Sequence, residues 1–191
     1  GLVVASPFDL ELSLTIVDRD SVLGWLVSRF GEWPAWGAVV ASLVVLVSTR
    51  GGGGASQRRL RPMAWGVVVV TALCPGLITQ ALKFLWGRVR FANLAAHRAD
   101  YTPFYVPAGP GAGESFPSGH VAMAMSTVAI PLHLSTLGRR GAAVVAWIVV
   151  LAYGLVVAWG RVRLGMHYLT DVLFSIGLCL LATPHVLRWF V

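Results

Sequence analysis

Five uncharged apolar runs, each close to the length that a bilayer demands, dominate this 191-residue chain. A helix needs about 20 apolar residues to cross the hydrocarbon core of a membrane. None of the runs alternates apolar and polar residues with a period of two, which argues against a barrel. We therefore predict an all-α polytopic membrane helix bundle with five visible spans, at Trp33–Thr49, Pro62–Leu82, Ser118–Leu137, Gly141–Gly160 and Val172–Leu187.

The charge content supports a membrane protein and argues against a nucleic-acid partner. Charged residues make up 12% of the chain, against about 25% in a soluble domain. The net charge of +7 comes from arginine, because Lys83 is the only lysine. The arginines lie in short loops between spans, where membrane orientation and lipid phosphate explain them. We predict a single domain, residues 1–191, whose partner is the bilayer; the sequence leaves its oligomeric state open.

The first 32 residues differ from the core bundle of residues 33–191. We interpret the apolar piece Gly1 to Ala5 as the end of a first span, which would make six spans in the intact protein. From Asp9 to Gly31, charges interrupt the apolar residues, a pattern typical of helices at the membrane interface; a packed peripheral helix fits equally. Within the second span, Pro75-Gly76 predicts a kink and not a break.

The basic loops predict the orientation of the chain. Arg50–Arg61 and Arg139-Arg140 fall on one side if the spans alternate, and the positive-inside rule makes that side cytoplasmic. The glycine run in the first loop lacks the Gly-Lys-Ser/Thr of a phosphate-binding loop, so we interpret it as a linker. The extracytoplasmic side then receives the N-terminal segment, the loop Trp86–Pro117 and the junction Arg161–His167.

Three polar clusters lie at span ends on this extracytoplasmic side, where ionisable groups are costly and therefore indicate function. In the last cluster, Asp171 follows His167 by one helical turn. Its carboxylate can hold one imidazole nitrogen and leave the other free as a nucleophile. Arg161 can place two N–H groups on a phosphoryl group. An interfacial salt bridge is the alternative interpretation of this cluster taken alone.

The other two clusters supply complementary groups. In Pro117-Ser118-Gly119-His120, the serine hydroxyl and the first N–H groups of a helix suit an anion, and the histidine beside it suits a general acid. A polar helix cap with an incidental histidine is the alternative. Lys83 and Arg90, six residues apart, suit charge neutralisation on a phosphoryl transition state. They also fit snorkelling side chains at a helix end.

Taken together, the three clusters resemble the type 2 phosphatidic acid phosphatase superfamily. Its pattern is Lys, six residues, Arg-Pro; then Pro-Ser-Gly-His; then Ser-Arg, five residues, His, three residues, Asp. This chain departs from it at Phe91, where the family has proline, and at Gly160, where it has serine. The resemblance implies that His167 becomes a phosphohistidine, that Asp171 orients it and that His120 protonates the leaving group. It also implies a metal-free and cofactor-free phosphate site formed by Lys83, Arg90, Ser118, Gly119 and Arg161.

We therefore predict a lipid phosphatase in a bacterial or archaeal plasma membrane. Its substrate is a lipid phosphomonoester or diphosphate of the undecaprenyl diphosphate, phosphatidylglycerol phosphate, phosphatidic acid or lipid A type. Arg88 and Arg163, which neighbour the clusters, are candidate contacts for the headgroup. Two alternatives stay open: a lipid phosphotransferase with the same intermediate, and an anion transporter, which would not require the pair His167 and Asp171.

Overall fold

A computed structural model describes residues 2, 6–52 and 54–190 of the chain. Within these residues the regular structure is helical, 73% of the chain being helix, which confirms the predicted all-α bundle. The interpretation of Gly1 to Ala5 concerns residues that, apart from Leu2, lie outside the described part.

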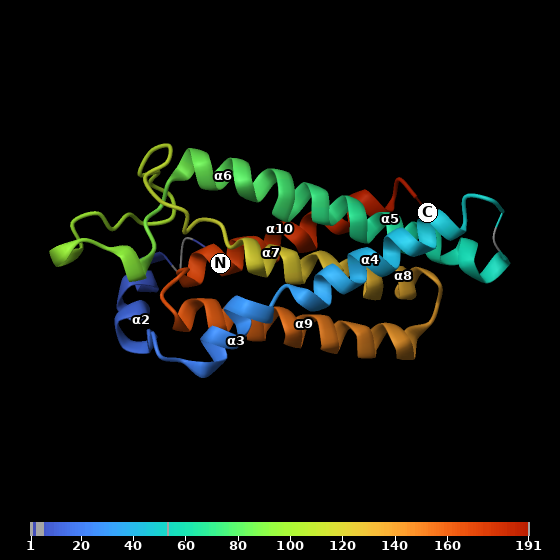
Figure 1. Ribbon diagram of the computed structural model, residues 1–191, viewed down its shortest axis with the longest axis horizontal. Helices are drawn as coiled ribbons and strands as arrows, with labels where there is room; N and C mark the ends of the chain where they lie inside the picture. The colour runs from blue at the N-terminus through green and yellow to red at the C-terminus, as the bar shows by residue number, and fades with distance from the viewer. Residues whose placement is uncertain (1, 3–5, 53, 191) are drawn as a thin grey trace.

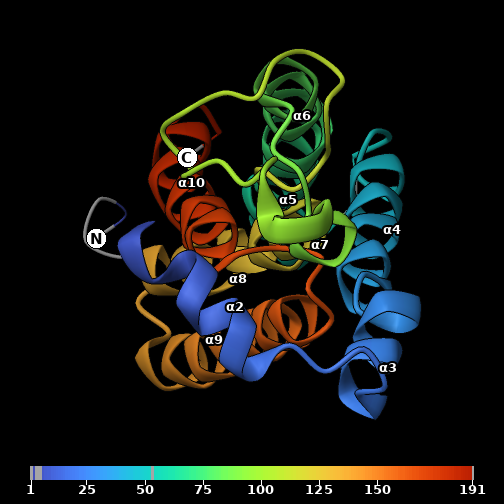
Figure 2. The same ribbon diagram turned by 90° about the vertical axis from the view of Figure 1, so that its left-hand side faces the viewer.

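The bundle is elongated, and its long helices run roughly along its longest axis (Figure 1). Viewed from one end, the outer helices surround a central pair, α7 and α8 (Figure 2). The outer helices are α4 (Trp33–Ser48), α5 (Ala55–Thr71), α6 (Thr79–Trp86), α9 (Arg140–Arg163) and α10 (Leu169–Leu187), and the central pair is α7 (Gly119–Met125) and α8 (Ala129–Thr136).

Four of the five predicted spans lie in helices that are long and apolar enough to cross a membrane. In the described residues these helices are Val22–Ser48, Gln57–Asn93, Arg140–Arg163 and Leu169–Leu187. The first starts earlier than predicted, because α3 (Val22–Phe30) runs into α4. The position of the short helix α2 (Asp9–Ile16) at a membrane interface stays a prediction.

The fifth predicted span, Ser118–Leu137, forms the buried centre of the bundle. The 3₁₀ segment η5 (Ser126–Val128) separates α7 from α8, and residues 121–129 are all buried. The Ser126 and Thr127 hydroxyls donate to the carbonyls of Met123 and Ala124, at 2.8 and 2.7 Å, so neither is left unsatisfied. Since α7 packs against α9 and α10, protein surrounds this helix.

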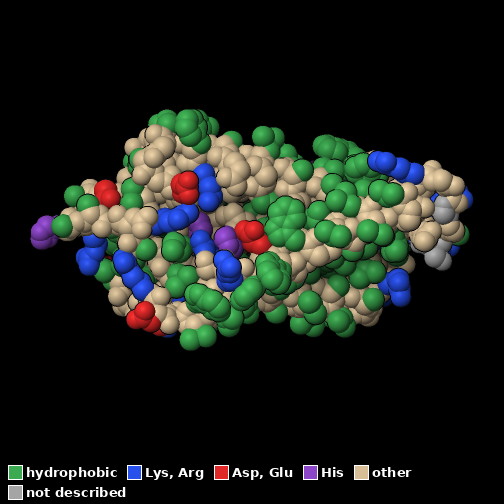
Figure 3. All heavy atoms as spheres, viewed as in Figure 1, with side chains coloured by type: hydrophobic (Ala, Val, Ile, Leu, Met, Phe, Trp, Pro, Cys, Tyr) green, Lys and Arg blue, Asp and Glu red, His purple; other side chains and the backbone are tan. Residues whose placement is uncertain are grey.

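The outer helices expose apolar side chains in numbers that a water-soluble surface rarely shows. They cover much of the face seen in Figure 3. On α4 and α9 they include Val40, Leu43, Val44, Val47, Val144, Val145, Ile148 and Val149. These faces suit contact with lipid acyl chains.

The second span continues through its proline, as predicted. Pro75 lies in a π-helical segment, η2 (Ala72–Ile78), that joins α5 to α6 without a break. The Pro75 carbonyl accepts a hydrogen bond from the Gln80 side chain at 3.2 Å. Single-turn π segments of this kind are frequent at functional sites.

The two ends of the bundle carry different connections (Figure 1). The loops that follow α4 and α8 lie at one end. The other end holds α2, the turn between α9 and α10, and the long loop from α6 to α7. That loop contains the short helices η3 (Phe91–Asn93) and η4 (Ala96–Arg98), and η1 (Ser6–Phe8) precedes α2. The basic loops and the predicted clusters therefore lie at opposite ends.

Candidate active site

His167 lies in the turn between α9 and α10, and only 1% of it is exposed. Its Nδ1 is 2.5 Å from the carbonyl oxygen of Ser115. The nearer carboxylate oxygen of Asp171 is 3.8 Å from the same nitrogen, which is too far for a hydrogen bond. The acceptor at Nδ1 is therefore a backbone carbonyl, and Asp171 does not form the hydrogen bond to the ring that we had expected. With the proton on Nδ1, the lone pair is on Nε2.

Asp171 acts on His167 through Ser115. The Ser115 hydroxyl donates to Asp171 Oδ2 at 2.5 Å, and its backbone N–H donates to the Arg88 carbonyl at 2.8 Å. The same Oδ2 accepts the backbone N–H of Tyr168 at 2.9 Å. The carboxylate thus holds in place the residue whose carbonyl orients the imidazole. Sequence reasoning missed Ser115, because one serine in a glycine-rich loop carries no signal of its own.

Arg88 is fully buried at the base of this network. Its Nη1 donates to Asp171 at 2.6 Å and its Nη2 to Asp9 at 2.9 Å. The guanidinium also lies 4.0 Å from the centre of the Tyr168 ring, a cation–π contact. The prediction that Arg88 contacts a headgroup is wrong, because the side chain has no exposed surface. Arg163 pairs with Asp18 at 2.6 Å and is 32% exposed, so its headgroup contact stays a prediction.

Asp9 ties the N-terminal helix α2 to the start of α10. It is fully buried and accepts both the backbone N–H of Thr170, at 3.0 Å, and the Thr170 hydroxyl, at 2.5 Å. In the sequence, Asp9 is one charge of a pattern that we interpreted as interfacial. Its partners are 79 and 161 residues away, so no local spacing could reveal them.

Several buried donors near these residues have no hydrogen-bond partner within the described part of the chain, and three of them belong to the predicted phosphate-binding set. These three are Nε of Arg90, Nε of Arg161 and the hydroxyl of Ser118; the hydroxyls of Thr79, Thr102 and Tyr168 are the others. Arg161 uses its Nη1 on the Ser28 hydroxyl at 3.0 Å, and Arg90 uses its Nη2 on Glu114 at 3.1 Å. A buried donor without a partner costs about 1–3 kcal/mol. An anion held between Arg90, Arg161 and Ser118 would satisfy these three donors.

The structure brings the three predicted clusters together. The Ser118 backbone N–H contacts the Asp171 carbonyl at 3.4 Å. A Cβ built on Gly119 would lie 3.9 Å from Nζ of Lys83. The charges of Lys83 and Arg161 act on both His120 and His167. On this face of the molecule, histidine side chains lie beside a group of cationic side chains (Figure 3).

His120 is held by the junction between α3 and α4, which sequence analysis had not connected with the site. Its Nδ1 is 3.2 Å from Oε1 of Glu32, and its Nε2 is 3.4 Å from the Ser28 carbonyl. Ser28 also contacts Arg161, so one residue of α3 links the candidate acid to the candidate phosphate ligand.

Burial decides the protonation state of His167. It lowers the pKa of the imidazole to about 4, and the charge of Arg161 acts in the same direction. The nearby negative charge of Asp171 opposes this change in the pKa without cancelling it. The ring is therefore neutral near pH 7, which is the form that can act as a nucleophile.

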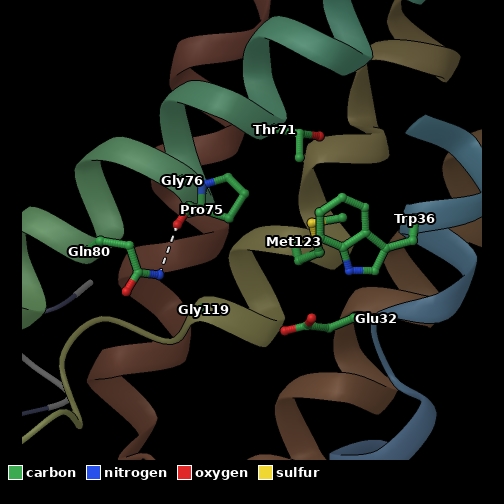
Figure 4. A pocket seen from close by; sticks show the side chains of 8 residues that line it. All are labelled: Glu32, Trp36, Thr71, Pro75, Gly76, Gln80, Gly119 and Met123. Carbon is green, nitrogen blue, oxygen red and sulfur yellow. Dashed lines mark hydrogen bonds between the residues drawn. The ribbon is translucent and has the colours of Figure 1, made fainter. Parts of the chain in front are cut away.

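A cavity of about 240 Å³ lies beside this site, between α4, η2 and α7 (Figure 4). The side chains of Trp36, Pro75 and Met123 give it an apolar wall, and Glu32 and Gly119 mark the part nearest the polar clusters (Figure 4). Thr71, Gly76 and Gln80 complete the lining.

Membrane-length helices around a cluster of cations and histidines define a polytopic membrane protein with a site suited to phosphate esters. A sequence model of the PAP2 superfamily matches residues 63–191, more than half of the chain, so the protein belongs to the PAP2 superfamily. Members of this superfamily are generally phosphatases that act on phosphate esters. No curated protein and no solved structure matches the chain. Asp9, Ser28 and Glu32 lie outside the matched range.

Proposed function

We propose that the protein is a membrane-embedded lipid phosphatase that forms a phosphohistidine on His167. The observation that carries this proposal is the set of unpartnered buried donors on Arg90, Arg161 and Ser118. They accompany an imidazole whose Nδ1 is occupied by the Ser115 carbonyl. A phosphoryl group offers several acceptor oxygens that would satisfy these donors. Its phosphorus atom would then lie close to the free Nε2 of His167.

In the first step, Nε2 of His167 attacks phosphorus and the bond from phosphorus to the leaving oxygen breaks. His120 gives its proton to that oxygen, so the leaving group departs as a neutral alcohol or as a protonated phosphate. Negative charge on the phosphoryl oxygens is greatest in the transition state. Lys83, Arg90 and Arg161 stabilise it there, which is how fixed charges accelerate phosphoryl transfer.

In the second step, water attacks the phosphohistidine. His120, now neutral, accepts a proton from that water, inorganic phosphate leaves, and Nε2 of His167 regains its lone pair. Both steps use the same residues in reversed proton roles. Neither step draws on a metal ion or a cofactor.

The apolar cavity favours a lipid substrate. It starts beside Gly119 and follows Trp36, Pro75 and Met123 between helices of membrane-spanning length. A phosphate ester with an acyl or prenyl tail could keep its tail there while its phosphate reaches the cations. Undecaprenyl diphosphate, phosphatidylglycerol phosphate, phosphatidic acid and lipid A all have this form. Because the basic loops lie at the opposite end, we place the site on the extracytoplasmic side of a bacterial or archaeal plasma membrane.

Phosphate release from a panel of lipid phosphates tests this proposal. The purified full chain, in detergent and without an added acceptor, should release inorganic phosphate from at least one of them. A substrate labelled on its phosphate should leave acid-labile label on the protein. His167→Ala should abolish the label and lower turnover by at least about 10³-fold.

His185→Ala is the matched control, because His185 is exposed near the far end of α10. Full phosphatase activity in His167→Ala would contradict the mechanism. Release that depends on an added acceptor would indicate a phosphotransferase. Activity should survive EDTA, and its loss there would contradict metal-free hydrolysis.

A further inference from the structure

Glu32 stands at a junction that two contacts fix to the rest of the bundle. It immediately precedes α4, and its carbonyl accepts the backbone N–H of Trp36 at 3.0 Å. The neighbouring Gly31 carbonyl accepts the Tyr153 hydroxyl of α9 at 2.5 Å. One turn earlier, the Ser28 hydroxyl accepts Arg161. The Glu32 carboxylate is therefore presented to the site from a well-anchored backbone.

The two histidines are each anchored through Nδ1, but by acceptors of different charge. The acceptor on His167 is the neutral Ser115 carbonyl, whereas the acceptor on His120 is the Glu32 carboxylate, at 3.2 Å. A carboxylate stabilises the imidazolium form, and a carbonyl does so far less. Glu32 therefore favours the imidazolium form on His120 more than the Ser115 carbonyl does on His167.

The charges around His120 make this carboxylate necessary. Burial disfavours a proton on the ring, and the charges of Arg161 and Lys83 act in the same direction. Glu32 is the acidic group that opposes them, and its side chain is only 34% exposed, so water screens it incompletely. Without Glu32, two cations would face a ring that must carry a third positive charge.

The geometry also directs the proton. With Nδ1 on Glu32, the ring has Nε2 left to donate, and that atom is 3.4 Å from the Ser28 carbonyl. This distance is at the outer limit of a hydrogen bond, so the contact is weak. An incoming leaving-group oxygen can replace it at little cost.

We propose that Glu32 is a positioning residue that favours the protonated form of His120 and directs its Nε2 at the leaving group. This inference rests on the proposed phosphatase function. It gives the N-terminal region a part in the protonation of the leaving group by His120. The match to the family, over residues 63–191, does not include this region.

The test compares leaving groups. An alkyl phosphate needs a proton on its leaving oxygen, whereas p-nitrophenyl phosphate releases a stable aryloxide without one. His120→Ala should slow the alkyl phosphate by about 10²–10⁴-fold and the aryl phosphate much less. Glu32→Gln should show the same selectivity, with a loss of about tenfold or more on the alkyl phosphate alone. Glu11→Gln, at an exposed position of α2, is the control and should change neither rate.

The ratio of the two rates does not depend on how much of the protein is folded, so a poorly folding variant still gives an answer. The double variant of Glu32→Gln with His120→Ala should be no slower on the alkyl phosphate than His120→Ala alone, because both changes remove one function. Glu32→Asp should recover part of the alkyl rate. Equal slowing of both substrates by Glu32→Gln, or additive losses in the double variant, would overturn the proposal. Neither result would contradict the proposed phosphohistidine on His167, because the His167→Ala variant tests that proposal separately.

Discussion

Arg88 and Asp171 form an ion pair in which neither side chain has any exposed surface, with 2.6 Å between Nη1 and Oδ1. The same guanidinium pairs with Asp9, so one cation serves two buried carboxylates. Buried charges are stable only when each finds its partners. The arrangement links α2, the segment after α6 and the start of α10, and it fixes Asp171 behind the His167 imidazole.

Asp9→Asn should therefore lower both stability and activity. The substitution keeps the shape of the side chain but removes its charge and one of its acceptors for Thr170. Removing one member of a buried ion pair costs about 3–5 kcal/mol. We expect a lower Tm in detergent and a lower kcat, because Arg88 and Asp171 lose their fixed positions. Asp20→Asn, at an exposed position, should match the unaltered protein. An Asp9→Asn variant with unchanged Tm would show that the network does not stabilise the fold.

Ser115→Ala separates the two functions of Ser115. It keeps the carbonyl that orients His167 and removes the hydroxyl that donates to Asp171. Losing one hydrogen bond to a buried carboxylate costs about 1–3 kcal/mol. We expect kcat to fall by about tenfold or more with little change in KM. Ser135→Ala is the control, since that hydroxyl donates only to the Pro131 carbonyl in the described structure and lies at the far end of α8. A kcat unchanged in Ser115→Ala would mean that Asp171 acts on His167 by another route.

The protonation of His167 gives a prediction for pH. Burial lowers the pKa of this imidazole to about 4, from an ordinary value of about 6.5. The folded protein therefore keeps His167 neutral down to about pH 5, where an exposed histidine is already charged. A phosphate monoester titrates near pH 6 itself, so the rate profile alone would mix the two ionisations. Histidine NMR avoids this, with the signal assigned by its loss in His167→Gln. A midpoint near 6.5 would contradict the assignment of a buried, neutral nucleophile.

The helices were predictable because membrane spans are a local property. A run of about 20 uncharged apolar residues identifies a span without reference to its neighbours. Whether a span faces lipid or protein depends on those neighbours, so the central position of Ser118–Leu137 was not visible in the sequence. The three motifs were predictable for a similar reason, since each is set by short spacings within one segment.

The N-terminal contribution to the site was not predictable, because it arises from contacts between distant segments. Asp9, Ser28 and Glu32 meet their partners only after α2 and α3 pack on the bundle. The same packing of α3 explains why this chain has Gly160 where the family has serine. A Cβ at Gly160 would lie 2.8 Å from Cβ of Val27, so the serine usual in the family would clash with α3 in this chain. The glycine permits the close approach that brings Ser28 to Arg161.

A block in the apolar cavity tests whether the lipid tail lies there. Gly76 lines the cavity, and a Cβ built on it would meet only the Thr71 carbonyl, at 3.4 Å, which is ordinary contact. A side chain can therefore start at this position without a clash at Cβ, and Gly76→Phe introduces a ring at the wall of the cavity. Gly37→Phe is the matched control, because a Cβ at Gly37 on α4 would meet nothing within 4 Å.

We expect Gly76→Phe to lower kcat/KM for a long-tailed lipid phosphate by at least about tenfold, a loss of about 1.4 kcal/mol. A short-chain soluble phosphate has no tail to displace, so its kcat/KM should stay within about twofold of the unaltered value. Gly37→Phe should leave both substrates unaffected. An equal loss on both substrates would mean that the ring disturbs the phosphate site itself. An unchanged rate on the lipid would place the tail on another surface of the bundle, since a filled cavity of this size cannot hold an acyl chain as well.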